Sequence, residues 1–162
     1  FGEETRNHLS SLDVSANKEL LYLYCDSNNI KSLDVSNNTK LIKLGCGSNL
    51  INNLDVSSNV ALEYLDCSDN SLGNLDLSKN ISLKKLKCYE SELEALNVSN
   101  CKVLEYLECD ENYLNELDLT KNSKLTYLNC EGNQISDLDL TNCRLLDELI
   151  CDDEVEVVAY NQ

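Results

Sequence analysis

Hydrophobic residues along this chain recur every 21 positions, a period far longer than the 2 of a single strand or the 3.6 of a helix. One such unit cannot bury its own leucines, but stacked units can. The pattern therefore predicts a solenoid of stacked coils, each with one short strand. Three leucine columns keep this spacing without a slip: Leu20, Leu41, Leu62, Leu83, Leu104, Leu125 and Leu146; Leu23, Leu44, Leu65, Leu86, Leu107, Leu128 and Leu149; and Leu12, Leu33, Leu54, Leu75, Leu96, Leu117 and Leu138.

A cysteine stands in each unit where the pattern asks for an apolar side chain. We expect these thiols to point inward and to pack as small hydrophobic groups. Partial disulfides and a zinc site are the alternatives, but adjacent parallel strands give poor disulfide dihedrals, and a straight column cannot wrap four thiolates around one ion. The chain has nine cysteines, an odd number, so complete internal pairing is impossible. The regular column comprises Cys25, Cys46, Cys67, Cys88, Cys109, Cys130 and Cys151.

Polar columns mark the turns of each unit. We expect the asparagines to satisfy backbone groups of adjacent turns, and the aspartates to be solvated by the hydroxyl two residues later and by turn amides. A cation ladder is the alternative for the aspartates. The first Asn column comprises Asn28, Asn49, Asn70, Asn112 and Asn133; the second comprises Asn17, Asn38, Asn59, Asn80 and Asn122, with Cys101 and Cys143 replacing it; and the Asp column comprises Asp13, Asp34, Asp55, Asp76, Asp118 and Asp139, with Asn97 breaking it.

The unit LxxLxCxxNx(I/L) followed by LDVSxN resembles the leucine-rich repeats of bacterial internalin J-type proteins, which carry a cysteine ladder. The resemblance covers about residues 9–152. It implies a right-handed leucine-rich-repeat solenoid with a parallel β-sheet on the concave face, little helix, and a role in adhesion at the bacterial cell surface or in a secreted protein. Residues 1–8 then form an N-terminal flank or partial cap. Residues 153–162, which include the alternating segment EVEVVAY, form a C-terminal cap or edge strand.

The charge of the chain limits its partners. The formal net charge is −16, with 11 acids against 6 bases in residues 1–81 and 18 against 7 in residues 82–162. Nucleic acids and anionic membrane surfaces need a positive footprint, so we exclude both, and no apolar run is long enough to insert into a membrane. The basic run SLKKLKC at residues 82–88 is neutralised by its neighbours one unit away, since Lys84 falls between Glu63 and Glu105, and Lys87 between Asp66 and Glu108.

Residues for catalysis are scarce. The only histidine, His8, precedes the repeats, so no Cys–His or Ser–His pair can form within them. The five glycines make no phosphate-binding loop. We predict that the protein is not an enzyme and has no cofactor. The start FGEETRNHL carries neither an initiator Met nor a secretion signal, and we expect it to begin a processed or excised segment.

The outward positions of the strands offer the best candidate for a binding surface. Tyrosine supplies amphipathic contact area at low entropic cost, and tyrosine alternates here with lysine. Two glycines, Gly45 and Gly47, predict a bare notch between Tyr24 and Tyr64 where a ligand approaches the backbone. We expect a protein or glycan to bind this face. The full candidate set is Tyr22, Tyr24, Lys43, Gly45, Gly47, Tyr64, Lys85, Tyr89, Tyr106 and Tyr127.

Two other functions are compatible with the same sequence. The solenoid can be a structural spacer between domains of a larger surface protein. It can also be a calcium-dependent interaction module, for which the acidic positions after the later strands, Asp110, Glu131 and Asp152, are weak ligand candidates without the spacing of an EF-hand.

Overall fold

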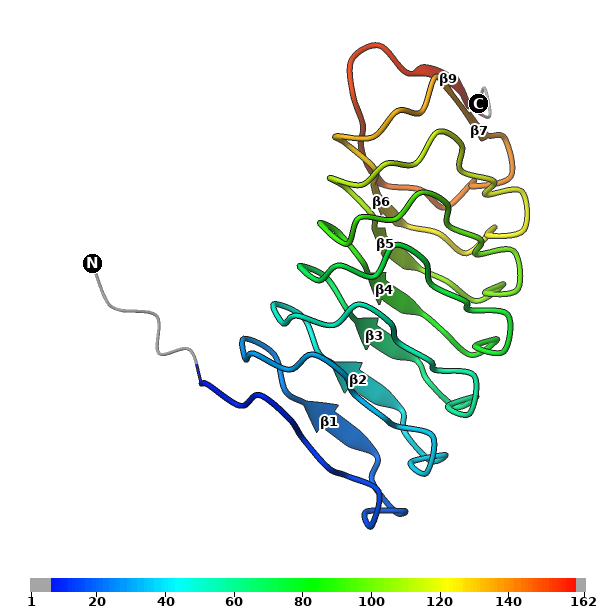
Figure 1. Cartoon of the computed structure of the whole chain (residues 1–162). Coiled ribbons are helices and arrows are strands. Elements are labelled where there is room, and N and C mark those ends of the chain that lie inside the picture. The colour runs from blue at the N-terminus through cyan, green and yellow to red at the C-terminus, as the bar shows by residue number, and fades with distance from the viewer. Residues whose placement is uncertain (1–6, 160–162) are drawn as a thin grey trace.

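A computed structural model describes residues 7–159, and within that range it contains nine β-strands and no helix (Figure 1). The predicted flank at residues 1–8 and the predicted cap at 153–162 therefore lie partly outside the described residues. The strands are β1 (Tyr22–Tyr24), β2 (Lys43–Gly45), β3 (Tyr64–Asp66), β4 (Lys85–Lys87), β5 (Tyr106–Glu108), β6 (Tyr127–Asn129), β7 (Asp137–Leu140), β8 (Glu148–Ile150) and β9 (Glu156–Ala159).

Seven of these strands form one parallel sheet in the order β1-β2-β3-β4-β5-β6-β8. Every pair is in register at a separation of 21 residues, so that Leu23 lies beside Leu44 and Leu44 beside Leu65. The prediction of a leucine-rich-repeat solenoid with a parallel sheet and little helix is confirmed. Each strand of this sheet is three residues long with its central leucine toward the core, and the chain bends only after the inward-facing cysteine that follows the strand.

The turns after β1, β2, β3, β5 and β6 are held by the first Asn column. The amide of Asn70 donates to the carbonyl oxygens of Cys46, Cys67 and Ser68 at 3.1 Å each, and its Oδ1 accepts from the backbone N–H of Ile51 at 2.9 Å. One side chain thus satisfies backbone groups of two successive coils, as the sequence predicts. The residue before each asparagine of this column adopts a left-handed backbone, with φ between 50° and 56° at Ser27, Ser48, Asp69 and Glu111 and 68° at Gly132; Glu90, before Ser91, does the same at 48°.

The core is a column of Leu, Val, Ile and Cys side chains that runs through the stack. The cysteines point inward as predicted: eight of the nine thiols are buried, Cys151 is half-buried, and all nine are free. Several thiols donate to carbonyl oxygens of the next coil, for example Cys88 Sγ to Glu108 O at 3.5 Å. Burial raises the pKa of Cys25 to about 11 and that of Cys130 to about 12. The ladder is therefore protonated at neutral pH and serves as packing.

The C-terminal segment departs from the repeat. Residues Glu156–Ala159 form a strand, β9, which pairs in parallel with β7 and does not extend the seven-stranded sheet beyond β8. The backbone N–H of Glu156 donates to the carbonyl of Ser136 at 2.9 Å at the start of this pairing. The final coil is thus closed by the β7–β9 pair, and among residues 7–159 no strand pairs with the outer edge of β8.

Candidate functional site

The outward side chains of the first and third residues in β1–β6 and β8 form one surface, which we call the strand face. Its first-residue column reads Tyr22, Lys43, Tyr64, Lys85, Tyr106, Tyr127 and Glu148, and its third-residue column reads Tyr24, Gly45, Asp66, Lys87, Glu108, Asn129 and Ile150. In-register pairing brings neighbours within each column side by side, since adjacent strands lie about 4.8 Å apart. The sequence order of these residues is therefore their spatial order.

Aromatic and cationic side chains are in direct contact along the first column. The Lys85 Nζ lies 3.6 Å from the ring centroid of Tyr106, and the Lys43 Nζ lies 5.8 Å from that of Tyr22. The rings of Tyr106 and Tyr127 are stacked, with centroids 4.2 Å apart and planes 5° from parallel. A cation over a tyrosine face contributes about 0.5–1 kcal/mol at an exposed site. These contacts hold the predicted residues in a fixed arrangement.

The third-residue column adds hydrogen bonds that orient the tyrosines. Tyr64 donates its hydroxyl to Asp66 Oδ2 at 3.2 Å, and Tyr106 donates to Glu108. The Glu108 carboxylate also forms an ion pair with the Lys87 Nζ at 2.7 Å. Partial burial and the bond to Glu108 raise the pKa of Tyr106, and the Glu108 carboxylate raises the pKa of Lys87 although burial opposes it. Both groups keep their protons at neutral pH.

The candidate set from the sequence omits Asp66, Lys87 and Glu108, although these side chains share the strand face with it. The signal was present in the sequence, because the third-residue column carries a charged residue in three successive units. Tyr89, by contrast, is not on a strand. It lies in the turn after β4 and is half-buried there, and its carbonyl accepts from the backbone N–H of Asp69 at 2.9 Å.

The predicted notch at Gly45 and Gly47 is wrong. Both glycines are buried, because side chains of neighbouring coils cover them. A Cβ at Gly45 would lie 2.7 Å from Tyr24 Cδ1 and 2.8 Å from Asp26 Oδ2. The backbone N–H of Gly47 donates to Asp26 Oδ1 at 3.0 Å. Glycine is needed here so that Tyr24 and Asp26 can lie against the backbone, and a ligand cannot reach it.

The acidic turns do not converge on a metal position. Asp110, Glu131 and Asp152 occupy equivalent places in successive turns, and within residues 7–159 no three His, Cys, Asp or Glu side chains are arranged to hold a metal ion. Asp152 is engaged by the chain, since it accepts from the backbone N–H groups of Gly132 and Asn133 at 3.0 and 3.4 Å. Partial burial, followed by nearby carboxylates, raises the pKa of Asp110.

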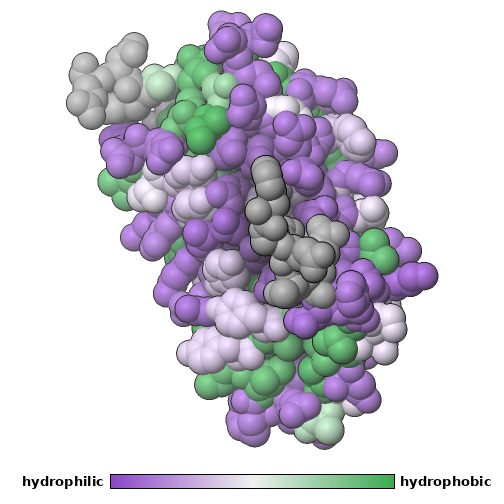
Figure 2. Space-filling model, turned by 90° about the vertical axis from the view of Figure 1, so that its left-hand side faces the viewer, coloured by the Kyte–Doolittle hydropathy of each residue, from purple (hydrophilic) through white to green (hydrophobic). Residues whose placement is uncertain are grey.

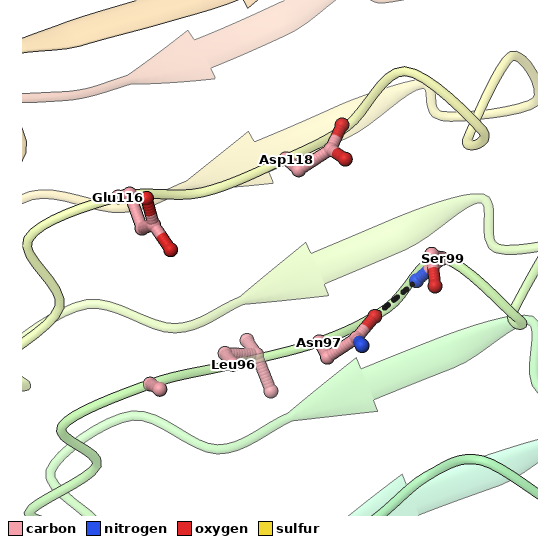
Figure 3. Close-up of a pocket in the computed structure, with 6 residues that line it drawn as sticks. Leu96, Asn97, Ser99, Glu116 and Asp118 are labelled. Atoms are coloured by element: carbon pink, nitrogen blue, oxygen red, sulfur yellow. Dashed lines mark hydrogen bonds between the residues drawn. The ribbon is translucent and has the colours of Figure 1, made fainter.

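Two successive segments that run in front of the strands in Figure 3 enclose a shallow hollow of about 290 Å³. The hollow is lined by Ala95, Leu96, Asn97, Ser99, Glu116 and Asp118. Its polar groups serve the backbone. Asn97 Oδ1 accepts from the N–H of Ser99 at 3.0 Å, and Asp118 Oδ1 accepts from Thr120 at 2.9 Å. Hydrogen bonds from the Ser or Thr two residues later lower the pKa throughout the Asp column. The column caps turns, as predicted.

The side of the stack that Figure 2 presents is mostly hydrophilic in its middle, and hydrophobic residues gather toward its two ends. Salt bridges between coils also reach the surface, for example Lys84 to Glu63 at 2.9 Å. No helix in the described part of the chain is long and apolar enough to cross a membrane. The strand face brings tyrosine rings into contact with charged side chains of the same and neighbouring coils.

Comparisons with known proteins identify the fold. No protein-family model matches the chain, and no curated protein sequence does. Among solved structures, the functional domain of InlJ from Listeria monocytogenes, which includes a cysteine ladder, is 32% identical with a TM-score of 0.78 over 92% of this chain and 38% of that one. An internalin, InlF, from the same species is 24% identical, with a TM-score of 0.86 over 94% of this chain and 47% of that one.

A leucine-rich-repeat protein of Leptospira interrogans shares the fold at 18% identity, with a TM-score of 0.81 over 93% of this chain and 48% of that one. The chain thus spans less than half the length of these three proteins. The resemblance to internalin J-type repeats with a cysteine ladder is confirmed.

Proposed function

We propose that this leucine-rich-repeat chain is a non-enzymatic recognition module that binds a protein or glycan through the strand face, in an adhesion-like role outside the cell or at a bacterial cell surface. The similarity to the InlJ functional domain and to internalins supports a protein-interaction module in general. The adhesive role, the location and the binding face belong to the proposal.

One observation carries the proposal, namely the fixed row of tyrosines on the strand face. Tyr22, Tyr64, Tyr106 and Tyr127 project from four strands of one in-register sheet. A lysine lies over the rings of Tyr22 and Tyr106, a carboxylate accepts from the hydroxyl of Tyr64, and Tyr127 stacks on Tyr106. A preorganised aromatic row loses little conformational entropy on binding. This is the arrangement that a recognition surface needs.

The chemistry of the described residues also favours binding over catalysis. A nucleophilic cysteine needs a lowered pKa and an accessible sulfur. Here burial raises the pKa of the thiols, and eight of the nine are buried. His8, the only histidine, is exposed and lies before the first coil. A cysteine nucleophile activated by an imidazole would need both groups together in one accessible place.

The test is a binding screen of the purified chain against mucin-type glycans and extracellular proteins. The variant is Tyr22→Ala, Tyr64→Ala and Tyr106→Ala combined, and the matched control is Tyr113→Ala, which removes an exposed tyrosine outside the strands. We expect the triple variant to lose at least about tenfold in affinity, because central aromatic residues dominate such interfaces. Thermal melting checks that it is folded.

Unchanged partner binding by the folded triple variant would refute the strand face as the binding surface. If neither protein binds anything in the screen, the structural spacer becomes the better description of this chain.

A further inference from the structure

Tyr127 differs from the other tyrosines of its column. In the first-residue column, Tyr22, Tyr64 and Tyr106 each pair in register with a lysine, either Lys43 or Lys85. Tyr127 pairs with Tyr106 on one side and with Glu148 on the other. It is the one tyrosine of this column, all of which the structure describes, that has no lysine neighbour.

The contacts of Tyr106 show which groups pack against a tyrosine ring on the strand face. Lys85 lies over one face of Tyr106 at 3.6 Å, and the ring of Tyr127 lies parallel to the other face at 4.2 Å. The order along the sheet is therefore cation, ring, ring. Because β8 follows β6 in the sheet, the second face of Tyr127 turns toward Glu148, whose side chain is exposed. This ring face lies beside a carboxylate where the earlier tyrosines have an ammonium group.

The surroundings of Tyr127 are acidic. The outward positions of β5, β6 and β8 carry Glu108 and Glu148 and no lysine or arginine, and Asp110, Glu131 and Asp152 follow directly in the turns. Burial and the carboxylates of Glu108, Glu148 and Asp110 raise the pKa of Tyr127. The earlier coils carry three lysines, Lys43, Lys85 and Lys87, against one acid, Asp66, at the same outward positions. The face is thus polarised along the stack.

We infer that the half-buried ring of Tyr127, on the side toward β8, and the exposed carboxylate of Glu148 form a subsite for a lysine or arginine side chain from a basic segment of a partner protein. This inference rests on the proposed function and narrows it to one class of partner. An arriving cation would stand on Tyr127 as Lys85 stands on Tyr106, and Glu148 would pair with its charge. A neutral glycan would gain nothing from Glu148, so the observations favour a basic protein segment.

The experiment uses a short fluorescein-labelled peptide in which arginine and serine alternate, with fluorescence anisotropy as the readout. A second peptide has citrulline in place of arginine, which keeps the shape and removes the charge. We expect the arginine peptide to bind and the citrulline peptide to bind more weakly. Tyr127→Leu should weaken binding of the arginine peptide about two- to fivefold, which is the range of an exposed cation–π contact.

Matched variants separate the subsite from general attraction to an acidic protein. Tyr127→Phe keeps the ring face and should bind like the wild type. Glu148→Gln should weaken binding, whereas Glu116→Gln, the same charge change at the hollow of Figure 3, should not. Equal binding of the two peptides, or equal effects of Glu148→Gln and Glu116→Gln, would overturn the inference.

The two proposals can fail separately. A partner from the screen that is lost by the Tyr22, Tyr64 and Tyr106 variant, but retained by both Tyr127→Leu and Glu148→Gln, would leave the proposed function standing and refute the subsite. A neutral glycan that depends on Tyr127 while the arginine peptide does not bind would also refute it.

Discussion

Replacing Asn70 by alanine should destabilise the solenoid by about 3 kcal/mol, and the estimate comes from its four hydrogen bonds. The N–H of Ile51, a residue with no exposed surface, has Asn70 Oδ1 as its acceptor at 2.9 Å. Leaving that donor buried and unpaired costs about 1–3 kcal/mol. The three carbonyls that accept from the Asn70 amide each keep a second donor, for example Asn49 Nδ2 on Cys46 O at 3.0 Å. Losing the three hydrogen bonds from the Asn70 amide to these carbonyls therefore costs less, about 0.5 kcal/mol each.

Urea denaturation followed by far-ultraviolet circular dichroism measures this loss. A serine already stands at this repeat position one coil later. Ser91 donates its hydroxyl to the carbonyls of Cys67 and Tyr89 at 3.2 and 3.1 Å, and so keeps part of the hydrogen bonding of an asparagine. Asn70→Ser should therefore cost less than Asn70→Ala. The control is Asn74→Ala, an exposed position where a change within about 0.5 kcal/mol is expected. An Asn70→Ala protein as stable as the wild type, or a serine variant as unstable as the alanine variant, would refute the role given to this column.

Three further outcomes follow from the same structure. In native protein at pH 8, a thiol reagent should modify about one cysteine per chain quickly, the half-buried Cys151, and the eight buried thiols only after unfolding; rapid reaction of several thiols would contradict the packing role. Because the folded pKa values of the Asp column are lowered, these carboxylates stabilise the fold above their unfolded pKa, and thermal melting should show this contribution disappearing as pH falls below about 4; Asp76→Asn should reduce that dependence. Adding a chelator should leave the melting temperature unchanged, since no metal-holding cluster exists among residues 7–159; a fall of several degrees would instead support the calcium-dependent module.

The fold was predictable because each column of the repeat has one environment. A leucine at position 23 and a leucine at position 44 face the same core, so the 21-residue spacing determines the register, and the spacing of Asn70 from its strand determines what its amide can reach. The geometry of the candidate site was less predictable, since it depends on how side chains of neighbouring coils are oriented. Tyr24 and Asp26 lean over Gly45 and remove the expected notch.

The same limit applies to the tyrosine stack and to the end of the chain. The sequence places Tyr106 beside Tyr127, but only the rotamers decide that their rings lie parallel. The strand β9 begins where the repeat fails, so its pairing with β7 could not be read from the column pattern.

The parallel in-register sheet also determines how this molecule would respond to a pulling force. Backbone hydrogen bonds between successive coils run along the long axis of the stack, for example from Cys46 N to Asp66 O at 2.8 Å and from Cys67 N to Lys87 O at 3.0 Å. Tension applied between the two termini therefore loads these bonds one coil at a time and peels the stack from an end. Each released coil of 21 residues adds about 70 Å of contour length. If the solenoid is tethered at both ends, it lengthens in steps under load, which would relieve the tension on a partner bound at the strand face as proposed above.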